Sequence, residues 1–120
     1  MKVMRVLILA LVTVALVSGC SYARRAERAK VAERAQTELV GLSKTELLTC
    51  AGIPPRSLAE GGLEFMTYQS SKYGWGGGCA VTFVLKDAVV ESVNYAGRTG
   101  RHSQNGEQCA YAVQGCLPAE

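Results

Sequence analysis

The residues of this 120-residue chain whose type and spacing suggest chemistry are its five cysteines. Cys20 stands by itself near the start, and the other four are spread over the second half of the chain. Thiols form disulfides, bind metal ions or carry out redox reactions. The chain has no C-x-x-C spacing, and the single histidine, His102, is not arranged with the cysteines, which argues against a metal or redox centre. We therefore expect structural disulfides among Cys50, Cys79, Cys109 and Cys116.

Four cysteines can pair in three ways, and the sequence restricts the choice only conditionally. If residues 107–117 are helical, Cys109 and Cys116 lie about 10.5 Å apart along the helix axis. That separation exceeds the Cα distance of about 7 Å that a disulfide spans, so both would reach to Cys50 and Cys79. If the segment is a loop, a bond between Cys109 and Cys116 becomes feasible, and the pairing therefore stays open.

Cys20 follows a segment that has the layout of a secretory signal peptide. Lys2 and Arg5 supply positive charge, residues 6–17 are apolar with one exception, and Val-Ser-Gly precedes the cysteine. This ending resembles the lipobox of bacterial lipoproteins, in which the thiol receives a diacylglycerol and the signal is removed directly before it. The resemblance implies that residues 1–19 are a lipoprotein signal peptide. It also implies that the mature chain starts at Cys20, with diacylglycerol and an N-acyl chain such as palmitate attached.

Two alternatives to lipidation remain. A retained transmembrane helix needs about 20 apolar residues, and the run before Cys20 is shorter and ends in small residues. A plainly secreted protein would keep Cys20 as a free thiol or place it in a disulfide. Two acyl chains would hold the protein on a membrane without help from the fold, because each buried methylene contributes about 0.8 kcal/mol.

Ser21 and the charge balance bear on location and partners. In the Gram-negative lipoproteins that this segment resembles, an Asp directly after the lipidated cysteine acts as an inner-membrane retention signal. This chain has Ser21 at that position. We therefore expect a lipid-anchored protein on the periplasm-facing side of the outer membrane. The chain has a net charge of +3, and without Lys2 and Arg5 it has 11 basic against 10 acidic residues, a net charge of +1. That balance and the location argue against a nucleic-acid partner.

The elements that must position the cysteines are a charged segment and one small domain. Residues 20–38 are rich in Ala, Arg and Glu and lack Pro and Gly. They predict a helical tether after the lipidated cysteine, either solvated or resting on anionic headgroups. Residues 39–117 then form a single α+β domain with a cysteine-containing C-terminal extension.

The domain begins with a helix whose start and end are both marked in the sequence. Ser43 and Glu46 have the spacing of a capping box, and Leu47 begins the apolar face of the helix that follows. Gly52 is placed to end the helix, since the two prolines that come next cannot continue it. We expect residues 56–60 to form a second short turn or loop.

Alternating polarity then predicts three strands, at residues 63–69, 79–86 and 89–95. In the last of them, strict alternation puts Val90 and Val93 on opposite faces. A tight turn at 87–88 joins the last two strands, with Ala88 where hairpins prefer Gly. In the middle strand, the residues expected to face the core are Cys79, Val81, Phe83 and Leu85. The predicted fold is α+β, with two short helices packed on a three-stranded antiparallel sheet (ααβββ) and stapled by disulfides.

The motifs of this region resemble those of the BamE-like (SmpA/OmlA) outer-membrane lipoprotein family. They are Gly41-Leu42-Ser43 with Glu46-Leu47-Leu48 and Gly52-x-Pro54, the strand motif Phe65-x-x-Tyr68, and the hairpin 81–90 with Ala88 in place of Gly. The resemblance covers about residues 39–95. It implies two helices on a three-stranded antiparallel sheet and a binding role beside the machinery that inserts β-barrels into the outer membrane. The four extra cysteines and the tail from Gly97 to Glu120 depart from the family pattern.

No constellation of residues in the sequence predicts catalysis. With one histidine, neither a Ser-His-Asp nor a Cys-His arrangement can be assembled convincingly, and His102 lies in a polar stretch that we expect to be an exposed loop. The glycine run 76–78 lacks the Lys-Ser/Thr of a phosphate-binding loop. We therefore expect no enzyme, no small-molecule substrate and no cofactor other than the lipid on Cys20.

The candidate partner-binding residues lie in two loops. Tyr73 and Trp75 stand in a Gly-rich loop between the first two predicted strands, and exposed aromatic side chains are common interface anchors. The alternative is that Trp75 folds back onto the small core. Arg98 and Arg101 mark the second loop, for which simple solvation is the alternative. The expected partner is an envelope protein, in outer-membrane assembly or envelope integrity. A secreted or periplasmic enzyme that this module inhibits is the second hypothesis.

Overall fold

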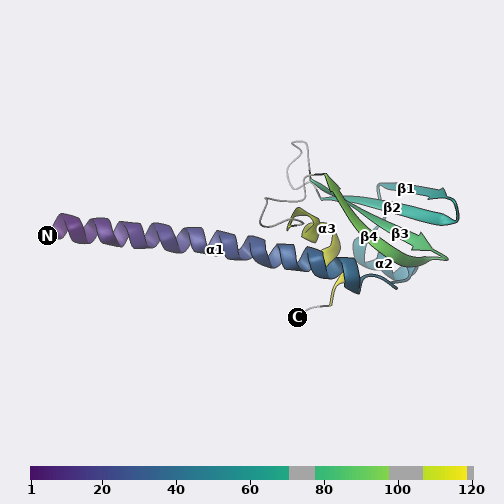
Figure 1. Cartoon of the computed structure of the whole chain (residues 1–120), viewed down its shortest axis with the longest axis horizontal. Coiled ribbons are helices and arrows are strands. Elements are labelled where there is room, and N and C mark those ends of the chain that lie inside the picture. Colours follow the sequence, from purple (N-terminus) through teal and green to yellow (C-terminus); the bar gives the residue numbers. More distant parts are fainter. Residues whose placement is uncertain (71–77, 98–106, 119–120) are drawn as a thin grey trace.

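The computed structural model describes residues 1–70, 78–97 and 107–118. A long helix projects from one end of a small domain made of a sheet and short helices (Figure 1). The helical elements are α1 (Lys2–Glu38), α2 (Lys44–Ala51), η1 (Glu107–Cys109), α3 (Ala110–Val113) and η2 (Gln114–Cys116). The strands are β1 (Arg56–Glu60), β2 (Leu63–Ser70), β3 (Cys79–Lys86) and β4 (Val89–Gly97).

The strands form one antiparallel sheet in the order β1-β2-β3-β4. The strict alternation of β3 places one set of its side chains in the core, as the sequence predicts. Residues opposite one another on neighbouring strands share a face of the sheet. One face therefore carries the core residues Met66, Tyr68, Cys79, Val81, Phe83, Leu85, Val90 and Val93.

The expected three-stranded sheet with two helices is wrong, although the α+β class holds. Residues 56–60 are a strand and not a loop, because they pair along their whole length with β2. Gly61 and Gly62 close this hairpin with positive φ angles of 61° and 79°, which glycine adopts without steric cost. All of β1 is exposed, so its sequence lacks the apolar alternation that would have revealed a strand. The helices also differ from the prediction. The helix α1, which includes the tether expected at residues 20–38, packs on the domain, and the short helices η1, α3 and η2 follow the sheet.

A β-bulge changes which side chains of β4 face the core. Val84 of β3 pairs with Ser92, whereas the next residue, Leu85, pairs with Val90. Glu91 is therefore an extra residue in β4. Because of it, Val90 and Val93 are both buried on the same side of the sheet. The strict alternation expected for this strand is wrong at this point.

The end of α1 is part of the domain core. Ala32 and Ala35 are 1% and 0% exposed, and Leu39, directly after the helix, is also buried. Gln36 Nε2 donates a 3.2 Å hydrogen bond to the Val93 carbonyl. We expected the whole tether to be either solvated or resting on anionic headgroups. Ala32 and Ala35 are instead small enough to let the backbone of α1 approach β4 and the C-terminal helices closely.

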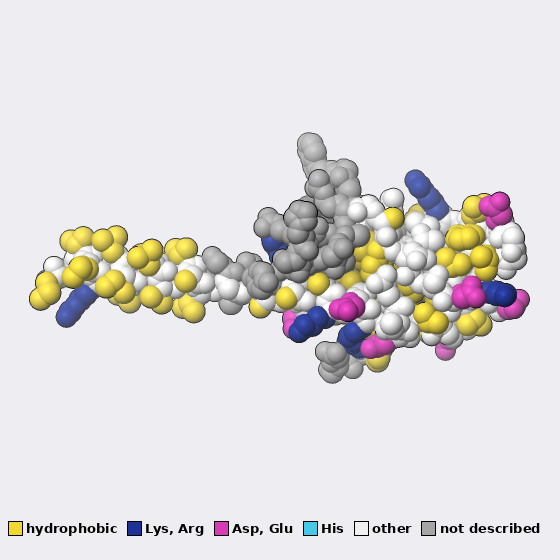
Figure 2. All heavy atoms as spheres, viewed as in Figure 1, with side chains coloured by type: hydrophobic (Ala, Val, Ile, Leu, Met, Phe, Trp, Pro, Cys, Tyr) yellow, Lys and Arg dark blue, Asp and Glu magenta, His cyan; other side chains and the backbone are white. Residues whose placement is uncertain are grey.

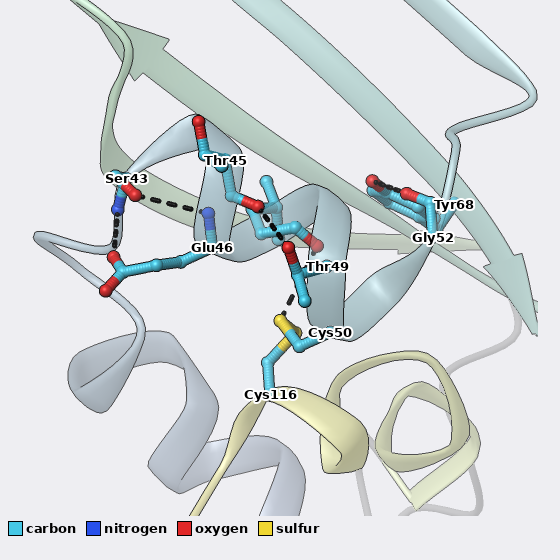
Figure 3. Close-up of a disulfide and its surroundings, with 9 residues drawn as sticks. Ser43, Thr45, Glu46, Thr49, Cys50, Gly52, Tyr68 and Cys116 are labelled. Carbon is cyan, nitrogen blue, oxygen red and sulfur yellow. Dashed lines mark hydrogen bonds between the residues drawn. A yellow bond between two sulfur atoms is a disulfide. The ribbon is translucent and has the colours of Figure 1, made fainter.

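The capping box of α2 is present as predicted (Figure 3). Ser43 Oγ accepts from the Glu46 backbone N–H at 3.2 Å, and Glu46 Oε2 accepts from the Ser43 N–H at 2.9 Å. These hydrogen bonds lower the pKa of Glu46. Gly52 ends the helix with a φ of 80°, and its carbonyl accepts a 2.8 Å hydrogen bond from the Tyr68 hydroxyl. This hydrogen bond joins the C-terminal end of α2 to β2.

Candidate interaction surface

Two disulfides fasten the C-terminal segment to the domain. Cys50 pairs with Cys116 at a Cα–Cα distance of 4.9 Å, and Cys79 pairs with Cys109 at 5.1 Å. Residues 107–116 are helical, so the conditional expectation that Cys109 and Cys116 reach to the other two cysteines is confirmed. Among the described residues, no group of His, Cys, Asp or Glu is arranged to hold a metal ion.

The C-terminal helices lie between α1 and the sheet and hold the two together. Cys79, Cys109, Ala110 and Val113 are all completely buried. Tyr111 lies beneath the Arg28 guanidinium of α1, with 5.6 Å between the guanidinium carbon and the ring centroid, a cation–π distance. Cys116 joins the end of this segment to α2, as Figure 3 shows. The four paired cysteines thus fasten the C-terminal helices to α2 and to β3.

The predicted partner-binding residues Tyr73, Trp75, Arg98 and Arg101 lie outside the described residues, as does His102. Cys20 lies within α1, and its side chain is outside the described part of the chain. All of these assignments stay predictions.

The strand ends that flank the two candidate loops are adjacent. Ser70, the last residue of β2, pairs with Cys79, and Cys79 pairs with Gly97 at the end of β4. The stretches that contain Tyr73 and Trp75 and that contain Arg98 and Arg101 therefore start from neighbouring positions at one end of the sheet. The sequence did not predict this adjacency, because it arises from the pairing of β2, β3 and β4.

The sheet face opposite the core is a second candidate surface, which the sequence did not indicate. Leu58, Phe65 and Val84 lie opposite one another across β1, β2 and β3. In the next row Thr67 and Thr82 face each other, with a 3.0 Å hydrogen bond between their hydroxyl groups. Apolar side chains are exposed on the sheet in Figure 2, and no described helix covers them. We name Leu58, Phe65 and Val84 the apolar row.

The two edges of the sheet differ in how they are protected. The β4 edge is covered where the segment between α1 and α2 pairs with it, since Gly41 N donates to Val90 O and Val90 N donates to Leu42 O, both at 2.8 Å. Ser43 and Val89 form an isolated bridge beside them. The β1 edge has no neighbouring strand in the described part of the chain.

No family model, no curated protein and no solved structure matches this chain. Across the described side chains, no helix combines the length and hydropathy needed to cross a membrane.

Proposed function

We propose that this chain is a lipid-anchored, non-enzymatic binding protein on the periplasmic side of the outer membrane of a Gram-negative bacterium. The observation that carries the proposal is the position of Cys20 directly after an apolar run and the residues Val-Ser-Gly. The two disulfides use the other four cysteines and leave Cys20 outside both pairs. Structural disulfides also suit an oxidising compartment such as the periplasm.

The proposed partner is an envelope protein, and the proposed process is outer-membrane β-barrel assembly or the maintenance of envelope integrity. Its support is the resemblance of residues 39–95 to the BamE-like family. The strand ends support it as well, because Ser70 and Gly97, which directly precede the two candidate segments in the chain, lie at the same end of the sheet.

Lipidation is tested by mass spectrometry of the mature protein purified from bacterial envelopes. We expect an N-terminus at Cys20 whose mass includes a diacylglycerol and a third acyl chain. Cys20→Ser should prevent cleavage and acylation. Ser18→Ala, which keeps a small residue before the cleavage site, is the matched control and should be processed normally. A mature Cys20 without lipid would contradict the anchor.

The partner is tested by chemical crosslinking in intact cells followed by purification in detergent. We expect components of the β-barrel assembly machinery in the crosslinked product, and we expect less of them with Trp75→Ala. Far-ultraviolet circular dichroism and the melting temperature of that variant show whether Trp75 belongs to the core instead. Recovery of a single secreted or periplasmic hydrolase, inhibited by the purified protein, would favour the inhibitor hypothesis over the proposed partner.

A further inference from the structure

The outer edge of β1 has no partner strand among the described residues, and its two ends are marked by Pro55 and Gly61. All five residues of β1 are exposed, and Leu58 is 58% exposed although it is a large apolar residue. Pro55, which has no N–H to donate, precedes the strand, and Gly61 turns the chain after it. Exposed strand edges present backbone N–H and C=O groups that can pair with another chain. The edge available for such pairing is therefore the five residues from Arg56 to Glu60.

The sequence of β1 is complementary to itself when it is reversed. Arg56, Leu58 and Glu60 alternate along the strand, so all three lie on the open face of the sheet. If a second β1 is laid antiparallel with Leu58 opposite Leu58, each Arg56 lies opposite the Glu60 of the other copy. Within the described part of the chain, neither Arg56 nor Glu60 has an ion-pair partner.

We propose that two copies of this chain form a symmetric dimer in which their β1 strands pair antiparallel about Leu58. The two four-stranded sheets then become one continuous sheet. Such an interface is isologous, because the same patch on each copy meets itself across a two-fold axis. Opposite charges that face each other across an antiparallel pair stabilise it, and like charges destabilise it.

The charge pattern and the apolar row both favour this occupant and this register. A shift of two residues would place Arg56 or Glu60 opposite Leu58 and would remove both ion pairs. In the proposed register, the apolar row of one copy continues through the two Leu58 side chains into the row of the other. A strand of unrelated sequence is not expected to place a Glu, an apolar residue and an Arg opposite Arg56, Leu58 and Glu60.

The two-fold axis also determines how the long helices leave the dimer. Antiparallel pairing reverses the strand direction of the second copy within the plane of the sheet. Since α1 and the strands run along the same long direction of the molecule (Figure 1), the two α1 helices point away from each other. Both N-terminal segments can reach one membrane when the dimer lies with its sheet along the membrane plane.

The test exchanges the two charges of β1 in the full-length protein, purified in detergent and examined by analytical ultracentrifugation over a range of concentrations. We expect a reversible monomer–dimer equilibrium for the unchanged protein. Arg56→Glu and Glu60→Arg should each raise the dimer dissociation constant at least ~10-fold, because two attractive pairs become two repulsive ones. The double variant R56E/E60R should restore the dimer, since the pattern is again self-complementary.

Mixing the two single variants gives a sharper result than either alone. An Arg56→Glu chain has Glu at both positions and a Glu60→Arg chain has Arg at both, so the mixture should form heterodimers more tightly than either chain forms homodimers. Glu91→Arg is the matched control, because it makes the same charge change on the opposite edge of the sheet. It should leave the dissociation constant unchanged. Circular dichroism and free-thiol counts confirm that each variant is folded.

Three results would overturn the dimer. They are a monomer at all concentrations tested, a dimer that is indifferent to both single charge reversals, and reversals that weaken it without rescue in the mixture or the double variant. Association through the detergent micelle would give the second of these results, because it does not depend on the charges of β1. A monomer whose β1 crosslinks to a different envelope protein would be a case of the first result. Because the readout is self-association in detergent, it does not depend on lipidation of Cys20, and a lipid-free Cys20→Ser protein should dimerise equally.

Discussion

Tyr95 joins β4 to α1 through one hydroxyl group. Its O–H donates a hydrogen bond to the carbonyl of Ala32, whose side chain is buried against the domain. Burial raises the pKa of Tyr95 to about 12, from an ordinary value near 10. The raised pKa means that the folded protein holds the proton of this hydroxyl more tightly than the unfolded chain does.

Replacing Tyr95 by Phe should remove this hydrogen bond with little change in shape. We expect the free energy of unfolding to fall by about 1 kcal/mol at neutral pH, as measured by urea unfolding. Below pH 10 the tyrosine is neutral in both states. Between pH 10 and about 12 only the unfolded chain loses the proton, so the unchanged protein should lose stability over this range.

Tyr68 also has a raised pKa and remains in the Tyr95→Phe variant, so the loss of stability with rising pH should become smaller in that variant without vanishing. An unaltered pH profile would show that Tyr95 titrates normally and is not held by α1.

Ala88 has a left-handed backbone conformation that glycine adopts more easily. Asp87 and Ala88 form the turn between β3 and β4 with φ angles of 50° and 62°, the left-handed region in which a Cβ atom is crowded. Replacing Ala88 by Gly should therefore stabilise the protein by about 1 kcal/mol. Ala96→Gly in β4 is the control, since it adds flexibility at an exposed strand position and should destabilise slightly. An Ala88→Gly variant that melts no higher than the unchanged protein would contradict the strain.

At the scale of elements, the C-terminal helices are held to α2 by the Cys50–Cys116 disulfide, which closes a separation of 66 residues. A crosslink over such a length restricts the unfolded chain and stabilises the fold by about 4 kcal/mol in the chain-entropy model. The Cys50→Ala/Cys116→Ala double variant should lose stability of that order in urea unfolding. Thr49→Ala, an exposed change on the same helix, should cost much less. A double variant as stable as the unchanged protein would show that the Cys79–Cys109 disulfide and the burial of Ala110 and Val113 are together enough to hold the segment.

At the scale of the whole molecule, the direction in which α1 leaves the domain depends on small side chains. Ala35 is 0% exposed, and a larger residue there would overfill the contact at a cost of about 1–3 kcal/mol. Ala35→Leu should therefore loosen α1 and speed its proteolysis, whereas Ala23→Leu, at an exposed position of the same helix, should not. Digestion followed by mass spectrometry measures both rates. Equal rates for the two variants would show that α1 does not depend on this contact.

Much of the domain could be predicted from local sequence, because the relevant interactions are local. Ser43 and Glu46 are three residues apart and cap one helix, and β3 carries its core residues in strict alternation. Reasoning from local sequence failed where a strand or a register depends on residues far away in the chain. β1 is wholly exposed and becomes a strand only by pairing with β2, and the bulge at Glu91 appears only in the register of β3 and β4.

By itself, the sequence determined the candidate lipid site at Cys20, the even number of cysteines left to pair, and the ends of α2, since each depends on neighbours along the chain. Only the tertiary structure decided which cysteines pair, that the alanines of α1 pack against the domain, and that Arg56, Leu58 and Glu60 share an open edge. The physical reason is that disulfides, helix packing and strand pairing join residues far apart in the chain. Their geometry exists only once the sheet has formed.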